Sequence, residues 1–182
     1  MAVQRTQVSP DEFERVVMLP ENADTLLELI DGEIVEVVSN EKSSALASRL
    51  GILVGGFILF NRLGFTTGAD GGYQIGSERY IPDFAFVSNK RQLTPSNEAY
   101  GSVPPDLAVE VLSPSNTPDE MAIKVDNYLR ANTVVWIVNP DAQRVTVHRP
   151  DAPPKTFDIS ETLDGGSILP GFTLPVRDIF AE

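Results

Sequence analysis

A glutamate in the middle of an apolar segment is the feature that most constrains how this chain can fold. The segment Leu107 to Leu112 reads LAVEVL and is followed by Ser113-Pro114, a pattern that predicts a short strand. A carboxylate among such neighbours is costly to bury unless a proton, a cationic side chain or a metal ion compensates its charge. One of these three must therefore account for Glu110.

Two more charged side chains stand in suggestive positions. Asp83 lies within the run Tyr80 to Val87, which also reads as a strand, so two carboxylates on neighbouring strands could share one hard cation. Lys124 lies on the helix that is expected to follow the Glu110 strand. The alternative without a metal is that Asp83 reaches solvent at a strand end and that Glu110 forms a buried ion pair, for which Lys124 is one candidate.

That helix is expected to run from Pro118 to Ala131, with Thr117 or Ser115 as its cap. The spacing predicts that its buried stripe contains Met121, Val125 and Leu129, and that Lys124 and Tyr128 lie one turn apart on an adjacent face.

Six segments in order along the chain resemble the PD-(D/E)XK nuclease superfamily and, within it, the Uma-two family of restriction-endonuclease-like proteins. Together they span nearly the whole chain, and their order makes the resemblance more specific than any one segment. They are LLELIDGEIVEVV (26–38), PDFAFV (82–87), PDLAVEVLSPSN (105–116), KVDNY (124–128), VWIVNP (135–140) and ILPGFTLPVRDIF (168–180).

The resemblance implies a fold, a reaction and a metal site. The fold would be α/β: one restriction-endonuclease-like domain over residues 1–182, with a mixed twisted sheet flanked by helices. Asp83 and Glu110 would bind Mg²⁺, or Mn²⁺ in its place, with the backbone carbonyl of Val111 as a third ligand, and Lys124 would assist catalysis. The reaction would be hydrolysis of phosphodiester bonds in a nucleic acid, with DNA as the expected substrate, and relatives suggest a homodimer.

The chain also departs from the superfamily pattern. Leu112 occupies the position two residues after the glutamate where nuclease relatives usually carry a lysine, and the resemblance suggests that Lys124 replaces it from the following helix. Tyr80 stands where a basic residue is common, while Arg79 is one step further out and could point to the other face. Two further residues are possible additions to the site. Glu28 resembles an extra acidic residue near the metal but could equally be a solvated strand residue, and Tyr128 could bond the site or be structural.

Charge and composition bear on the class of protein. The 182 residues contain 26 Asp and Glu against 14 Lys and Arg, a formal charge of -12 that opposes nonspecific binding to a phosphate backbone. Cysteine is absent, so no disulfide or thiolate metal site can form, which is compatible with the cytoplasmic location that we expect. Residues Met1 to Leu19 show no secretory signal pattern. The apolar stretch Leu50 to Phe60 is shorter than the roughly 20 residues that span a bilayer, so we expect a core helix and no membrane association.

Local signals predict the remaining elements. Asp31-Gly32 between two apolar runs predicts a β-hairpin, and Ser9 with Glu12 forms a capping-box pattern at the start of a short helix. A longer helix is expected from Ser43 to Asn61, with Leu46, Leu50, Leu53, Phe57 and Phe60 on its apolar face. Residues Ser88 to Val103 are expected to form a surface loop, and a polar connection with prolines is expected before Ile168.

A second class of function competes with the nuclease. In that alternative the chain is a catalytically degenerate nuclease fold that binds protein or nucleic acid, and Asp83, Glu110 and Lys124 survive as a structural polar cluster.

Overall fold

The computed structural model describes residues 7–181. The predicted domain, residues 1–182, and the segment 1–19, in which no signal pattern was found, therefore both include residues outside this range. In chain order the elements are α1 (Pro10–Val17), η1 (Pro20–Asn22), β1 (Leu27–Ile30), β2 (Glu33–Glu36), α2 (Glu41–Phe60), β3 (Gly64–Thr67), β4 (Gly72–Ile75), β5 (Glu78–Tyr80), β6 (Phe84–Ser88), β7 (Tyr100–Gly101), β8 (Leu107–Val111), α3 (Pro118–Arg130), β9 (Val134–Asn139), β10 (Arg144–Arg149), β11 (Ala152–Phe157), β12 (Thr162–Asp164), β13 (Thr173–Pro175) and α4 (Val176–Phe180).

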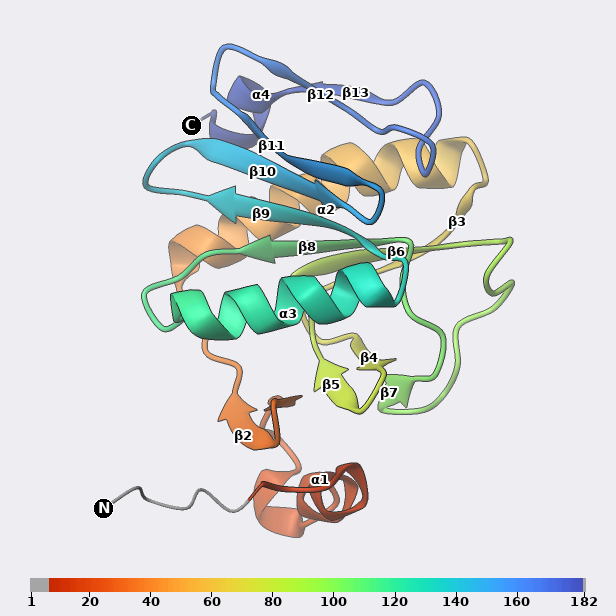
Figure 1. Ribbon diagram of the computed structural model, residues 1–182. Helices are drawn as coiled ribbons and strands as arrows, with labels where there is room; N and C mark the ends of the chain where they lie inside the picture. The colour runs from red at the N-terminus through yellow and green to blue at the C-terminus, as the bar shows by residue number, and fades with distance from the viewer. Residues whose placement is uncertain (1–6, 182) are drawn as a thin grey trace.

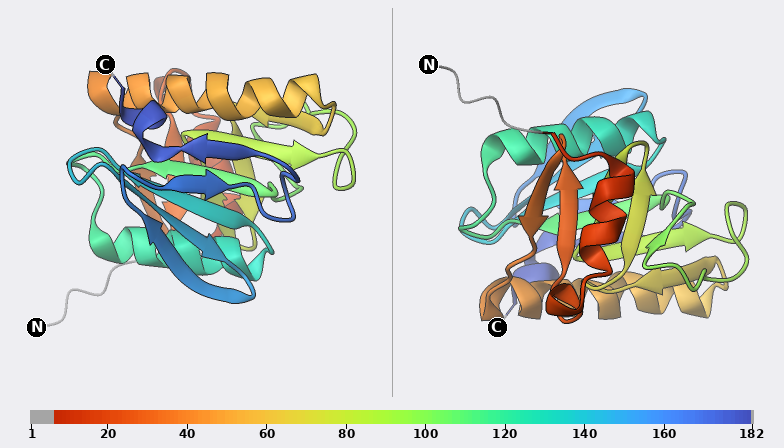
Figure 2. Two further views of the ribbon diagram at one scale, coloured as in Figure 1. Left: turned by 90° about the horizontal axis from the view of Figure 1, so that it is seen from above. Right: turned by 90° about the horizontal axis from the view of Figure 1, so that it is seen from below.

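A six-stranded mixed sheet forms the centre of the molecule, with strand order β11-β10-β9-β8-β6-β3. Strands β8 and β9 are parallel because the chain crosses over through α3, and the other neighbours are antiparallel. Helices α2 and α3 cover opposite faces of this sheet (Figures 1 and 2). The α/β fold with a mixed sheet between helices, predicted from the sequence, is confirmed.

Side chains alternate between the two faces of the central sheet, and this alternation determines where the charged residues point. Val109 and Trp136 pack in the core that α2 and the C-terminal elements cover. Ala108 and Val135 pack in a second core with Tyr128 of α3. Glu110 has the same parity as Ala108, so it points toward α3 and away from the larger core.

A second, five-stranded sheet with order β2-β1-β5-β4-β7 packs on the α3 side. Its β1–β2 hairpin confirms the predicted turn, since Asp31 and Gly32 have φ angles of 49° and 77°. Helix α1 covers the outer face of this sheet through the fully buried Phe13, and the predicted capping box at Ser9 is present. Figure 2 shows α1 lying against the hairpin.

Helix α2 is the predicted core helix, but it begins earlier and faces differently. It spans 20 residues from Glu41, with Asn40 as its N-cap, so the prediction that it is too short to cross a bilayer was wrong. Length and composition alone would allow a membrane span, which is weak evidence because a core helix satisfies the same test. Leu50, Val54 and Ile58 are fully buried, whereas Phe60, which we expected on the inner face, is 88% exposed.

The predicted strand Tyr80 to Val87 is in fact two strands in two sheets. Strand β5 ends at Tyr80 in the five-stranded sheet, and β6 begins at Phe84 in the central sheet. The chain changes sheet through Ile81-Pro82-Asp83, where Pro82 has no N–H to continue a ladder. Asp83 therefore lies immediately before β6 and not within a strand.

Two regions that we expected to be irregular contain strands. Residues Tyr100–Gly101 form β7, which pairs with β4, and the Tyr100 ring is buried. Residues Ala152–Phe157 form β11 at the edge of the central sheet despite Pro153 and Pro154, since an edge strand tolerates proline where no partner needs its N–H.

Candidate active site

Asp83 and Glu110 are brought together by the antiparallel pairing of β6 and β8. In this register Phe84 pairs with Val109, so the next pair outward would be Asp83 with Glu110. Residues opposite each other on antiparallel strands point to the same face, so both carboxylates reach the same side of the sheet. The expectation that the two acids lie on neighbouring strands is confirmed in this sense, with Asp83 at the entrance to its strand.

Lys124 on α3 forms a buried cluster with two acids, Glu28 and Glu110. Its Nζ lies 2.9 Å from Glu28 Oε1, 3.1 Å from Glu28 Oε2 and 2.9 Å from Glu110 Oε1. Lys124 is 4% exposed, so the three residues form a buried salt-bridge network with Lys124 at its centre. The buried residues of α3 are Met121, Lys124 and Tyr128. Val125 and Leu129, which were predicted to be buried together with Met121, are only half-buried. The predicted stripe was therefore right for Met121 and wrong for Val125 and Leu129, because α3 turns Lys124 toward two carboxylates.

Glu28 on β1 is a member of the cluster and not a solvated strand residue. It is 5% exposed, and its Oε1 also accepts a hydrogen bond of 2.5 Å from the backbone N–H of Ile81. Glu28 thus connects Lys124 to the segment that places Asp83 between the two sheets. The alternative in which Glu28 is exposed is excluded.

Two tyrosines enclose the cluster on the side of α3. Tyr128 is fully buried, and its hydroxyl donates to Glu110 Oε1 at 3.0 Å. Tyr80 packs edge-on against Tyr128 at a centroid distance of 5.2 Å and lies 5.4 Å from Lys124 Nζ. Asn127 donates to the Tyr80 hydroxyl at 2.8 Å. Tyr128 therefore bonds the site directly, and Tyr80 fills the position where a basic residue was expected.

Arg79 is directed away from the cluster. Its Nη2 lies 2.7 Å from Glu14 of α1, and its Nη1 donates to the backbone oxygen of Glu78. It is 6% exposed, and it is not among the residues that line the cavity beside Glu110. The possibility that Arg79 points to the other face is confirmed.

Burial and charge shift the pKa values of the cluster in different directions. Burial raises the pKa of Glu110 to about 7, although Lys124 partly offsets this effect. Burial also raises the pKa of Asp83, against the hydrogen bond from Val111. Burial alone would lower the pKa of Lys124, but Glu110 and Glu28 more than offset this, so its pKa is raised and the ammonium persists. Lys124 thus offsets only part of the effect of burial on the pKa of Glu110.

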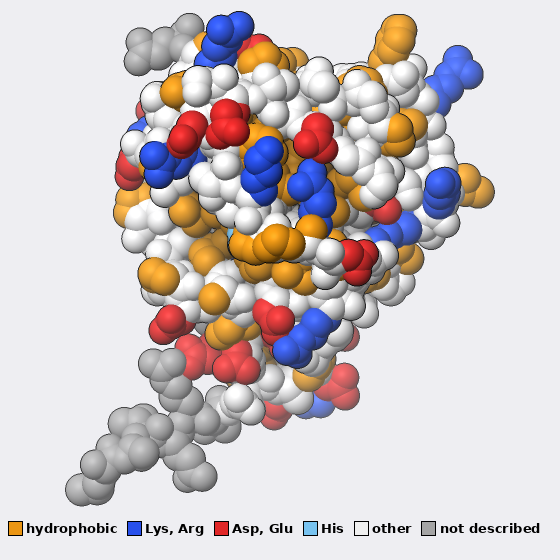
Figure 3. Space-filling view, turned by 45° about the horizontal axis from the view of Figure 1, so that its top comes forward, with side chains coloured by type: hydrophobic (Ala, Val, Ile, Leu, Met, Phe, Trp, Pro, Cys, Tyr) orange, Lys and Arg blue, Asp and Glu red, His pale blue; other side chains and the backbone are white. Residues whose placement is uncertain are grey.

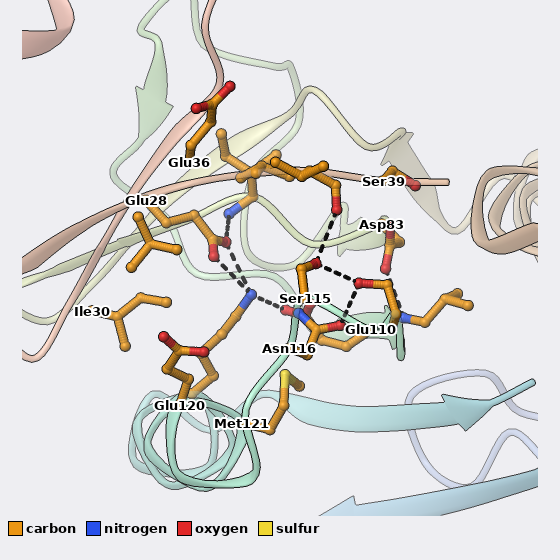
Figure 4. Close-up of a pocket in the computed structure, with 17 residues that line it drawn as sticks. Glu28, Ile30, Glu36, Ser39, Asp83, Glu110, Ser115, Asn116, Glu120 and Met121 are labelled. Atoms are coloured by element: carbon orange, nitrogen blue, oxygen red, sulfur yellow. Dashed lines mark hydrogen bonds and ion pairs between the residues drawn. The ribbon is translucent and has the colours of Figure 1, made fainter. Parts of the chain in front are cut away.

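A small polar cavity of about 70 Å³ opens beside these residues. Figure 4 shows Glu28, Asp83 and Glu110 around it, with Glu36 on the β2 side and Glu120 on the α3 side. The segments before α2 and before α3 form its remaining walls, and Ser115 Oγ joins them by donating to the Val38 oxygen at 3.3 Å. These walls could not be predicted from the sequence, because no sequence pattern marks Val37, Val38 or Ser39 as site residues.

The donor set fits a hard divalent cation held by two protein carboxylates. Val111 N–H donates to Asp83 Oδ2 at 2.6 Å, and Glu110 Oε1 is bound by Lys124 and Tyr128. In residues 7–181 no hydrogen bond is formed to Asp83 Oδ1 or Glu110 Oε2, so each acid is anchored through one oxygen and keeps the other. The same residues contain no group of three acidic, His or Cys side chains that could hold a metal, and Mg²⁺ needs only one or two carboxylates.

Charge balance agrees with this fit. Glu28, Asp83 and Glu110 as carboxylates and Lys124 as an ammonium leave two negative charges uncompensated, and Glu36 and Glu120 in the cavity walls add to this excess, part of which a divalent cation would neutralise. Val111 lines the cavity, but the contact that the structure gives is through its N–H, and the ligand role of its carbonyl stays a prediction.

Comparison with known proteins agrees with this fold and sequence pattern. A solved structure described as a putative nuclease belonging to DUF820 from Anabaena variabilis ATCC 29413 superposes with a TM-score of 0.83 at 23% identity, covering 95% of this chain and 97% of that one. That likeness establishes the fold. The chain has no match among curated proteins. The model of the Uma2 family, described as "Putative restriction endonuclease", matches residues 10–177. The chain therefore belongs to the Uma2 family.

Proposed function

We propose that this protein is a Mg²⁺-dependent nuclease that hydrolyses phosphodiester bonds, with DNA as its substrate. The observation that carries the proposal is that Asp83, immediately before β6, and Glu110, on the neighbouring β8, face the same side of the central sheet, each with one oxygen left for a cation, beside the buried ammonium of Lys124. Membership of the Uma2 family supports the same reaction class.

In the proposed reaction a water oxygen forms a bond to phosphorus, and the bond from phosphorus to the leaving sugar oxygen breaks. The water loses a proton and the leaving oxygen gains one. Asp83 and Glu110 would hold the cation, which supplies Lewis acidity toward the phosphate and a lower pKa for the attacking water. Lys124 is fixed by Glu28, so its ammonium is oriented before substrate arrives and stabilises negative charge as it develops.

The overall charge of -12 requires that such a site attract phosphate locally. Figure 3 shows one face of the molecule on which Lys and Arg side chains are interspersed with Asp and Glu and form no continuous basic surface. Among the described residues that line the cavity, Lys124 is the only Lys or Arg, and it is already paired with Glu28 and Glu110, so we propose that nucleic acid binding depends on the metal. A homodimer and a cytoplasmic location remain part of this proposal by analogy.

A second candidate is the degenerate module that binds protein or nucleic acid. The closed ion pair favours it, because Lys124 already satisfies one oxygen of Glu110 and both oxygens of Glu28 without any ligand. In that case the cluster serves stability alone.

One assay separates the two candidates. Single-stranded DNA, duplex DNA and RNA are incubated with Mg²⁺ or Mn²⁺ and with wild type, Asp83→Asn, Glu110→Gln or Lys124→Met, after each variant is shown to be folded. The nuclease predicts metal-dependent cleavage that falls by at least about a hundredfold in each variant. Titration calorimetry on the same samples should show metal binding that Asp83→Asn abolishes. A wild type that binds no metal and cleaves nothing would overturn the nuclease and leave the binding module.

A further inference from the structure

Asp83 lies between two cavities of very different size. The catalytic cavity described above has a volume of about 70 Å³, whereas a second cavity of about 350 Å³ lies between α2 and the turn after β3, and Asp83 lines both. At about 70 Å³ the catalytic cavity is far below the volume of roughly 300 Å³ at which small-molecule sites begin. The volume of the second cavity is near the lower end of the range of roughly 300–1,000 Å³ that is usual for small-molecule sites.

The second cavity, hereafter the hydroxyl-lined cavity, is chemically unlike the first. Four of its side chains are hydroxyls, and its other residues are small apart from Asp83 and Phe84. They are Ser44, Ala47, Ser48, Gly51, Thr66, Thr67, Gly68 and Ala69. Asp83 is the only charged residue among those that line it. Hydroxyls donate hydrogen bonds to sugar and phosphate oxygens without the repulsion that carboxylates would exert.

The other walls of the catalytic cavity are less suited to a phosphodiester chain. Glu36 on β2 and Glu120 on α3 both line it, and both are exposed or half-buried and bring negative charge close to any phosphate that crosses them (Figure 4). A strand whose phosphate reaches Asp83 therefore meets carboxylates in one direction and uncharged hydroxyls in the other.

We propose that the hydroxyl-lined cavity binds the nucleotide that flanks the scissile phosphate, so that the strand passes around the end of the central sheet at Asp83, from the cavity on the α3 side to the hydroxyl-lined cavity on the α2 side. This inference rests on the proposed nuclease function and adds the position of the substrate strand. Ser44, Ser48 and Thr66 contact its sugar and phosphate oxygens, and Gly51 leaves the space for them between α2 and Phe84.

Gly51 offers a direct steric test. A Cβ built there would meet Phe84 Cδ2 at 3.7 Å, an ordinary contact, so the Cβ of Gly51→Leu causes no clash, and we expect the rest of its side chain to occupy the cavity. The matched control is Gly56→Leu on the same helix, where a Cβ would meet nothing within 4 Å and which does not line the cavity. Both changes replace a helical glycine by leucine, so their effect on helix stability should be similar.

A second pair of variants tests the charge of the occupant. Ser48→Lys places an ammonium at the hydroxyl-lined cavity, and Ala45→Lys places one on an exposed position of α2 that does not line it. If a phosphate lies in the cavity, Ser48→Lys should tighten binding several-fold and steepen the slope of log affinity against log salt by about 0.7. Ala45→Lys should do neither.

The experiment measures anisotropy of dye-labelled phosphorothioate oligonucleotides, which resist cleavage, with Mn²⁺ present and with thermal unfolding and calorimetric Mn²⁺ binding recorded for every variant. We expect Gly51→Leu to bind about tenfold more weakly than Gly56→Leu while both bind Mn²⁺ like wild type. If the two leucine variants bind equally, and the two lysine variants also bind equally, the hydroxyl-lined cavity is not the strand site, and the cleavage assay above still decides the proposed nuclease function separately. If wild type binds no oligonucleotide, the nuclease and this inference both fail.

Discussion

Replacing Lys124 by methionine should be among the most destabilising single changes in this protein. Methionine keeps a similar length and removes the ammonium that lies within 3.1 Å of three carboxylate oxygens. Glu28 and Glu110 are only 5% and 6% exposed, so two carboxyls would be left buried without a cation. Removal of one partner from a buried ion pair costs about 3–5 kcal/mol of unfolding free energy. We expect a loss in that range at pH 8.

The loss should depend on pH in a defined direction. Burial already raises the pKa of Glu110 to about 7 with Lys124 present, and removal of the lysine raises it further. A carboxyl with a raised pKa binds more protons in the folded state, so stability is fully present below its unfolded pKa and falls as pH rises toward the folded value. In Lys124→Met this fall continues beyond pH 7, at up to about 1.4 kcal/mol per pH unit for Glu110. The variant should therefore be closest to wild type near pH 5.

Urea unfolding of both proteins at pH 5 and pH 8 measures this difference. Lys42→Met is the matched control, because its pair with Asp141 has the same 2.8–2.9 Å length but side chains that are 61% and 93% exposed, and it should change stability by less than about 1 kcal/mol. If Lys124→Met costs no more than Lys42→Met, or costs the same at both pH values, Lys124 does not compensate the two buried acids and the geometry of the cluster would have to be revised.

Two further predictions concern the same cluster. Metal affinity should rise by up to about tenfold per pH unit below pH 7, because a cation requires Glu110 in its ionised form, and calorimetry of Mn²⁺ binding from pH 6 to 8 would show no such rise if Glu110 is not a ligand. Tyr128→Phe removes a buried hydroxyl that donates to Glu110 and should cost about 1–3 kcal/mol in urea unfolding; an unchanged free energy would mean that this hydrogen bond contributes nothing to the fold.

The parts of the structure that the sequence predicted are those determined by local chemistry. The Asp31-Gly32 turn and the Ser9 capping box each depend on residues within four positions, and both formed as expected. The Glu110 strand also formed where its apolar run predicted it. Asp83 and Glu110 could be identified because a carboxylate in an apolar segment requires a compensating group wherever the rest of the chain lies.

The parts that failed depend on distant residues. Helix α3 should bury Val125 and Leu129 by its apolar pattern, yet it buries Lys124, because Glu28 lies 96 residues away on another sheet and supplies a carboxylate. No periodicity within α3 contains that information. Strand β11 was missed because its prolines disfavour a strand locally, and only its position at the sheet edge permits them.

The role of Lys124 links stability to the proposed chemistry. An ammonium that bound every carboxylate oxygen would leave no ligand for a metal ion. Without the ammonium, burial of the carboxylates would cost too much free energy for a stable fold. The structure lies between these limits: Lys124 neutralises Glu28 and shares one oxygen of Glu110, while Asp83 is held by a backbone N–H that carries no formal charge. The remaining negative charge faces the cavity in which we propose that a divalent cation binds. The cation should therefore stabilise the wild type on binding, and it should stabilise Lys124→Met still more, because there it also replaces the missing charge.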